Sequence, residues 1–149
     1  MVKTYRILLK VPNPIIKINI IVLYNMNLKQ IFISGAVMLL LDAVYLSSFS
    51  GFFNKLVISI QGSKIKFNII GAILCYILLI GGLNYFIISR RKSLQEAFLL
   101  GIVIYGVYET TNLTIFNNWN PQAVALDTLW GGILFALTSA ITYRLSIII

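Results

Sequence analysis

The chain has 149 residues, of which 59% are hydrophobic and only 11% are charged. Soluble domains are nearer to about half apolar and a quarter charged, and the mean hydropathy here is +0.92. A soluble globule of this size could not bury so much apolar surface. The composition therefore excludes a soluble enzyme, a disordered chain and a disulfide scaffold, and it predicts a multi-pass integral membrane protein.

The charges are strongly unbalanced, with a formal net charge of +8. In a soluble protein this excess would indicate a nucleic-acid partner. Here the bases stand between long apolar runs, where cations anchor membrane-spanning helices, so we expect the lipid bilayer as partner and no nucleic acid. The chain has no His, the commonest general base and metal ligand, and we expect no cofactor. The single Cys75 is expected to be a small buried packing residue.

Residues 1–25 are predicted to form an extension ahead of the membrane domain. Their apolar run over residues 15–24 is interrupted by Lys17 and is too short to span a bilayer. No small-residue cleavage site follows, so a signal peptide is not expected. Met26 stands directly before the first long apolar run. The extension is therefore interpreted as an interfacial arm or a mis-assigned start, and the membrane domain as residues 26–149.

Four apolar stretches are each long enough to cross ~30 Å of hydrocarbon as a helix. Ser93 and Glu96 form a capping-box pattern at the start of the third stretch. Asn120 and Pro121 are an N-cap and a first-turn residue at the start of the fourth. The predicted fold class is all-α, a four-helix bundle in the membrane. The predicted spans cover about residues 28–50, 67–89, 94–116 and 121–143.

The link between the first two spans, residues 51–66, is mixed in character. Phe52, Phe53 and Leu56 are interspersed with polar residues such as Lys55. Such a pattern is compatible with a segment that lies along the membrane surface. It is equally compatible with an ordered loop that makes apolar contacts.

The distribution of bases predicts the orientation in the membrane. With four spans, both termini and the second link share one side, and the first link lies on the other. Lys55, Lys64 and Lys66 are on the side of the first link, whereas the remaining nine of the twelve bases are on the side of the termini. The positive-inside rule therefore predicts that both termini are cytosolic.

Three of the four acidic residues fall inside predicted spans, namely Asp42, Glu109 and Asp127. The helix rise places each of them about 9–12 Å below the non-cytoplasmic end of its span. Acids inside a membrane are costly and face the bundle interior. We therefore expect the three carboxyl groups to share one depth in a common interior.

Aromatic, polar and small residues stand three or four positions from these acids, on the same helix faces. Tyr and Asn side chains supply hydrogen bonds there, and small residues let the helices approach closely. The predicted polar cluster consists of Asp42, Tyr45, Tyr105, Glu109, Asn112, Asp127 and Trp130, with helix packing at Gly35, Gly106 and Gly131.

No Lys or Arg is expected at the depth of the acids to neutralise them. Three ionised carboxylates at close range in a low dielectric are untenable, so protons or a bound cation must compensate. Three interpretations stay open: protonated acids that only join helices by hydrogen bonds, a proton- or cation-binding centre, and recognition of a polar head group or solute. The sequence does not identify a metal.

Three motifs resemble those of a bacterial family of predicted four-span membrane proteins, domain of unknown function 2177. Residues 105–113 resemble its Tyr-Gly-x-Tyr-Asp-Leu-Thr-Asn-Leu motif, with Glu109 in place of Asp and Thr110 in place of Leu. Residues 127–131 resemble its Asp-x-x-Trp-Gly motif, and residues 41–46 its first-helix motif, in which an aromatic residue follows Asp by three. The resemblance implies the four-span fold but no established activity.

Two functions are therefore compatible with the sequence. In the first, the carboxylate cluster binds or translocates a proton, cation or small solute; because four helices are few for a solute pathway, this function predicts a homo-oligomer. In the alternative, the protein is a non-catalytic lipid-binding or membrane assembly subunit in which the acids fix helix packing. An enzyme is not expected, because His and a recognisable nucleophile motif are absent.

Overall fold

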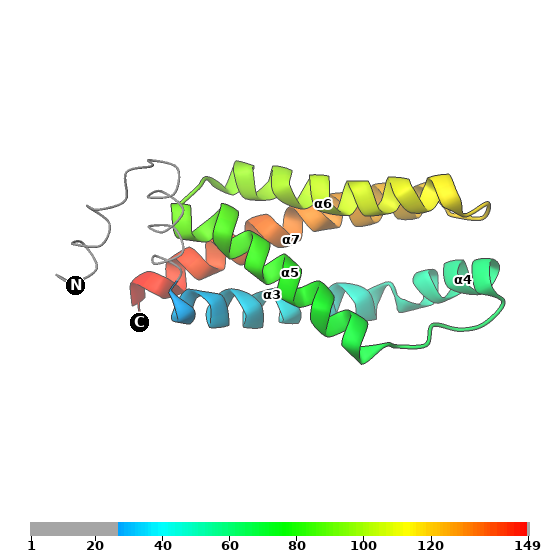
Figure 1. Ribbon diagram of the computed structural model, residues 1–149, viewed down its shortest axis with the longest axis horizontal. Coiled ribbons are helices and arrows are strands. Elements are labelled where there is room, and N and C mark those ends of the chain that lie inside the picture. Colours follow the sequence, from blue (N-terminus) through cyan, green and yellow to red (C-terminus); the bar gives the residue numbers. More distant parts are fainter. Residues whose placement is uncertain (1–26, 149) are drawn as a thin grey trace, which may run out of the picture.

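The computed structural model describes residues 27–148, and every regular element in that range is helical (Figure 1). The extension predicted for residues 1–25 lies outside the described residues. Four segments are long and apolar enough to cross a membrane: α3, α5 together with η1, α6 and α7. The prediction of an all-α, four-span membrane bundle is therefore confirmed. The elements in chain order are α3 (Leu28–Ser48), α4 (Ser50–Gln61), α5 (Ile69–Phe86), the 3-10 turn η1 (Ile88–Arg90), α6 (Leu94–Ile115) and α7 (Pro121–Ile148).

The helices begin where side chains cap the first-turn amides. The side chain of Asn27 accepts from the Lys29 amide at 3.0 Å at the start of α3. Asn68 accepts in the same way from Ile70 and Gly71, both at 3.1 Å, at the start of α5. These caps satisfy amides that have no partner within the helix. The helix ends differ from the predicted spans more than the helix starts do. α3 ends at Ser48 instead of residue 50, and α7 continues to Ile148 instead of ending at residue 143.

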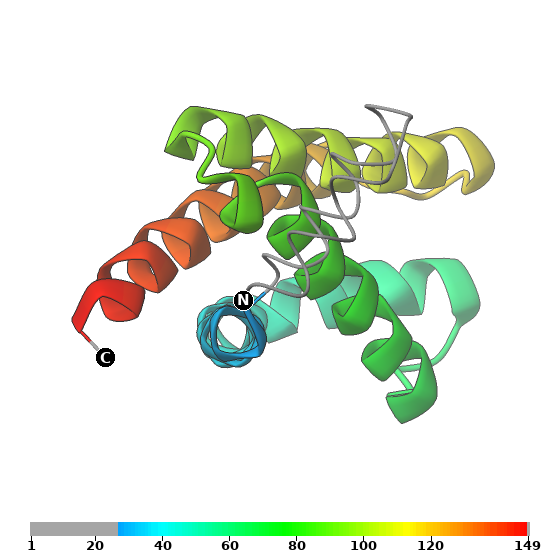
Figure 2. The same ribbon diagram turned by 60° about the vertical axis from the view of Figure 1, so that its left-hand side comes forward.

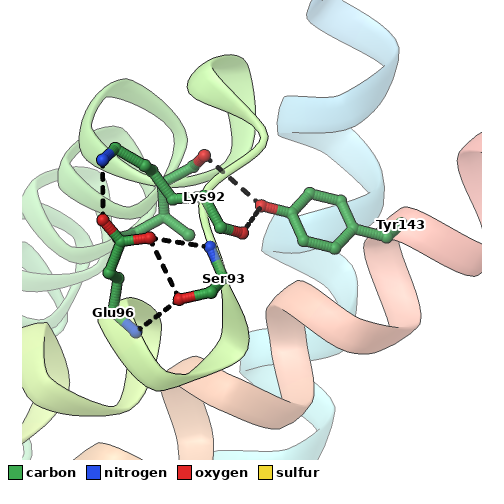
Figure 3. Close-up of polar contacts among 5 residues, drawn as sticks. Lys92, Ser93, Glu96 and Tyr143 are labelled. Carbon is green, nitrogen blue, oxygen red and sulfur yellow. Dashed lines mark hydrogen bonds and ion pairs between the residues drawn. The ribbon is translucent and has the colours of Figure 1, made fainter.

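The turn between α5 and α6 is fixed by the predicted capping box (Figure 3). Ser93 Oγ accepts from the Glu96 amide at 3.2 Å, and the Glu96 carboxylate accepts from the Ser93 amide at 2.9 Å. Lys92 Nζ pairs with the same carboxylate at 2.6 Å. The Tyr143 hydroxyl of α7 donates to the Lys92 carbonyl oxygen at 2.9 Å. The end of α7 is thereby attached to the turn that starts α6.

The hairpin of α6 and α7 is the most closely packed pair of helices, and glycines permit it. A Cβ built on Gly101 of α6 would collide with the carbonyl oxygen of Gly131 and lie 2.9 Å from the Cα of Gly132 on α7. On Gly132 it would lie 2.7 Å from the Phe98 ring. Gly132 belongs to a Gly-Gly pair in which helix packing is expected from the sequence, whereas Gly101 was not predicted; the two mark the closest backbone approach.

The three glycines predicted to serve helix packing differ in how closely they are approached. A Cβ on Gly131 would collide with the Tyr105 ring. On Gly35 it would lie 3.3 Å from an Ile80 methyl group, which is tight, and on Gly106 it would meet a Thr128 methyl group at an ordinary 3.4 Å. Close approach therefore requires glycine at 131, whereas position 106 has room for a methyl group.

The remaining two spans assemble around this hairpin. α3 packs against α7, and α5 packs against α3, where Asn84 Nδ2 donates to Ser34 Oγ at 2.8 Å. α5 leaves the turn near α6 and then diverges from it, as both views show (Figures 1 and 2). The buried apolar cluster that joins the four spans consists of Met38, Leu79, Leu83, Ile87, Ile88, Ala97, Leu134 and Phe135.

The link between the first two spans contains most of the helix α4, so its interpretation as a loop is wrong for residues 51–61. α4 is amphipathic and buries Leu56. Asn118 in the α6–α7 turn donates to the Ser59 carbonyl oxygen at 3.1 Å. α4 therefore lies beside that turn, at the end of the bundle opposite the C-terminus (Figure 1). That the segment lies along the membrane surface stays a prediction.

Five of the eight bases in the described residues lie at one end of the bundle, which carries the start of α3, the α5–α6 turn and the end of α7 (Figure 1). We therefore predict that a fluorescent protein fused after Ile149 folds in the cytosol, whereas alkaline phosphatase fused there is inactive. Reporters inserted after Ser63 serve as the control and should give the reverse pattern. Phosphatase activity at the C-terminal fusion would contradict the orientation. The bases at this end of the described chain are Lys29, Arg90, Arg91, Lys92 and Arg144.

Candidate functional site

Three spans each contribute one acid to the interior of the bundle. Asp42 lies on α3 with 7% of its surface exposed, and Glu109 lies on α6 with 2% exposed. Asp127 on α7 is half-buried. Tyr45 donates to Asp127 and stacks on Trp130, which donates to Asp42. The structure therefore brings together acids that are far apart in the sequence.

Both carboxyl oxygens of Asp42 accept a hydrogen bond from another helix. Trp130 of α7 donates its indole Nε1–H to Oδ1 at 2.8 Å. Tyr76 of α5 donates its hydroxyl to Oδ2 at 2.6 Å. Because an indole nitrogen is a donor only, Oδ1 must act as an acceptor. Asp42 therefore connects α3 to α5 and α7 through neutral donors.

Tyr45 links Asp127 to the surroundings of Asp42. Its hydroxyl donates to Asp127 Oδ1 at 3.0 Å. Its ring stacks on Trp130, with centroids 4.4 Å apart and planes inclined by 8°. Since Trp130 also donates to Asp42, the stacked pair lies between the two aspartates and holds both donors in place.

Glu109 is bonded on one side and faces a second acid on the other. Trp119, in the α6–α7 turn, donates its indole N–H to Oε2 at 2.8 Å. The carboxyl group of Glu109 lies near that of Asp127, close enough for their charges to interact. An ionised carboxylate only accepts hydrogen bonds, so two carboxyl groups form one only when a proton lies between them. Side by side, the two carboxyl groups cannot both be ionised without strong repulsion.

No cationic side chain within the described residues neutralises the three acids. In residues 27–148 the ion pair is that of Lys92 with Glu96, outside the cluster. In the same range no three His, Cys, Asp or Glu side chains converge closely enough to hold a metal ion. The partners of the acids are thus neutral N–H and O–H groups and one another.

Two residues predicted for the cluster occupy different surroundings. Tyr105 packs against Gly131 and makes an edge contact with the Phe135 ring, with centroids 6.5 Å apart. Asn112 is half-buried, and its amide nitrogen has no hydrogen-bond partner among the described residues. Neither donates to a carboxyl group in the hydrogen bonds seen there.

Two donors of the cluster, Tyr76 and Trp119, were missed in the sequence. The helix rise puts Tyr76 about 10 Å into α5, which is the depth of the three acids. This depth could have identified Tyr76 as a candidate partner of the acids. Trp119 stands outside the predicted spans, where no contact with a buried acid is expected. It reaches Glu109 because the short turn folds it back over the end of α6.

The comparisons with known proteins identify a family. A family model described as "Predicted membrane protein (DUF2177)" matches residues 27–144, a range that contains Asp42, Glu109 and Asp127. No curated protein and no solved structure matches the chain. With its four apolar helices, the chain is a multi-pass integral membrane protein. The match covers most of the chain and includes the three acid-bearing motifs. The protein therefore belongs to the DUF2177 family of predicted membrane proteins.

Proposed function

We propose that the protein binds an exchangeable proton at the Glu109–Asp127 pair and uses it in proton-linked transport. The observation that carries the proposal is that two acids of neighbouring helices face each other inside the bundle, and that no cationic side chain of residues 27–148 forms an ion pair with them. Two like charges at close range in a low dielectric cannot both persist. One proton resolves the conflict, and its loss or gain changes the charge of the interior.

The third acid has a different role in this proposal. Asp42 receives a donor on each oxygen, and hydrogen bonds to a carboxylate favour its charged form. The stacked Tyr45 and Trp130 rings link Asp42 to Asp127, so a change at the pair is felt by the helices that Asp42 joins. In this proposal Asp42 joins the helices through its two donors, and Glu109 and Asp127 hold the proton.

A short route to one membrane face accompanies the pair. Glu109 stands about 9 Å from the end of α6 by the helix rise. Trp119 in the adjoining turn contacts it directly. A proton that enters at the α6–α7 turn would need to cross only this distance to reach the pair.

The test combines spectroscopy with flux measurements on the full chain. Infrared spectra of the reconstituted protein should show the carbonyl stretch of a protonated, buried carboxyl group. Glu109→Gln should remove this band and reduce proton uptake by vesicles, under an imposed potential, to that of protein-free vesicles. The physical reason is that an amide keeps the shape of the side chain but cannot release a proton.

Glu96→Gln is the matched control, because it makes the same chemical change on the same helix. Glu96 is outside the cluster, and glutamine retains the capping box. We expect this variant to keep the band and the flux. Unchanged flux in Glu109→Gln, or no protonated carboxyl group in the parent protein, would overturn the proposal.

A second function, that of a non-catalytic lipid-binding or assembly subunit, is favoured by one observation. The donors to Asp42 come from α5 and α7, so this acid joins three spans by hydrogen bonds. In that case the acids serve only to fix helix packing. Glu109→Gln would then fold normally with no change in proton uptake by the vesicles.

A further inference from the structure

We infer that the cavity between α5, α6 and α7 binds an amphiphile that carries a protonated amine on an apolar body. The cavity has a volume of about 430 Å³, within the ~300–1,000 Å³ typical of small-molecule sites. This inference rests on the proposed function, since the ammonium group would replace the proton at Asp127. The cavity is lined by Cys75, Leu78, Leu79, Ile104, Tyr105, Tyr108 and Asp127.

α5 diverges from α6 after their shared turn (Figures 1 and 2), and the cavity is lined by residues of these two helices and of α7. Its rim residues are exposed on the membrane-spanning surface, with Leu78 75% and Tyr108 58% exposed. Cys75 is also exposed, so the prediction that it is a buried packing residue is wrong. A ligand dissolved in the bilayer would therefore reach the cavity from the side, without crossing the aqueous phase.

The chemistry of the lining selects a cationic head group. Asp127 is the acid among otherwise apolar and aromatic residues. Its Oδ1 already accepts from Tyr45, but a carboxylate has room for further donors. An ammonium group would add charge-assisted hydrogen bonds, and the Tyr105 and Tyr108 rings offer cation–π contacts. The aliphatic walls of Leu78, Leu79 and Ile104 fit the apolar body of such a molecule.

The test measures equilibrium binding of radiolabelled N,N-dimethyldecylamine to the full chain in phosphatidylcholine nanodiscs, with empty nanodiscs as background. Decanol is the matched neutral ligand, so this comparison requires no variant. We expect saturable amine binding to the parent protein, and binding weaker by about tenfold or more for decanol and for Asp127→Asn, because a buried charge loses its partner. Equal binding of amine and alcohol would overturn the inference.

Two further measurements make the result specific. Alkylation of Cys75, the only cysteine of the chain, should block amine binding, and Cys75→Ser should be insensitive to the reagent. Binding that survives alkylation of the parent would place the ligand elsewhere and overturn the inference. Replacing part of the lipid by phosphatidylethanolamine tests the source: competition assigns the site to an amino-headed lipid, and unchanged binding assigns it to a free lipophilic amine.

Glu109→Gln separates this inference from the proposed function. That variant removes the protonated carboxyl pair but leaves every residue of the cavity lining in place. We expect it to lose proton uptake and to retain amine binding. Amine binding without a proton signal in the parent would refute only the proposed function, and a proton signal without amine binding would refute only the present inference.

Discussion

Gly101→Ala is expected to lower the free energy of unfolding by about 3 kcal/mol, a large effect for a single methyl group. The added Cβ would collide with the carbonyl oxygen of Gly131. Backbone atoms cannot rotate away as a flexible side chain can, so α6 and α7 must separate. Their separation would loosen the contacts along the most closely packed pair of helices in the bundle.

Gly106→Ala is the matched control, on the same helix and with the same chemical change. There the added Cβ would lie at an ordinary 3.4 Å from a Thr128 methyl group, and we expect a change below about 1 kcal/mol. Both variants can be compared by reversible unfolding in mixed micelles, followed by helical circular dichroism. Equal stability of the two variants would contradict the close approach at Gly101.

Asp42→Leu should also destabilise the fold, because it leaves the Trp130 and Tyr76 donors without their acceptor. Hydrogen bonds between membrane helices contribute about 0.6–1.7 kcal/mol each, so the loss of two predicts about 1–3 kcal/mol. Asp42→Asn should cost less than about 1 kcal/mol. Its amide oxygen still accepts from the indole, and its N–H can donate to the tyrosine oxygen.

The asparagine and leucine variants together separate hydrogen bonding from charge at this position. If both lowered the unfolding free energy equally, the negative charge of Asp42 would be the required property. Their difference is best measured with the same unfolding method, with Trp130 fluorescence as a local probe. A leucine variant as stable as the parent would contradict the role of Asp42 in joining α3 to α5 and α7.

Gly101→Ala and Asp42→Leu disturb different parts of the same site. The α6–α7 hairpin, closed at Gly101 and Gly131, sets the distance between the helices that carry Glu109 and Asp127. Packing of α3 and α5 then supplies donors to the acids of the interior. Separation of the hairpin should therefore weaken the proton signal of Glu109 as well as the fold.

The amino-acid sequence by itself determined the four spans, the capping box at Ser93 and the helix start at Pro121. Span length, first-turn capping and the restricted backbone of proline act over a few neighbouring residues, so they can be identified without knowledge of the fold. It also singled out Asp42, Glu109 and Asp127, because a buried charge is costly wherever a span is placed.

Only the tertiary structure decided which groups the acids contact. The hydrogen bond from Tyr76 to Asp42 depends on how α5 crosses α3, and that from Trp119 to Glu109 on how the α6–α7 turn folds back. Helix periodicity assigns residues to a face but does not determine which neighbouring helix that face meets. The same limit explains why Gly101, the point of closest backbone approach, and the lateral cavity beside Asp127 were not predicted: both arise from the distance and angle between helices, which local patterns do not encode.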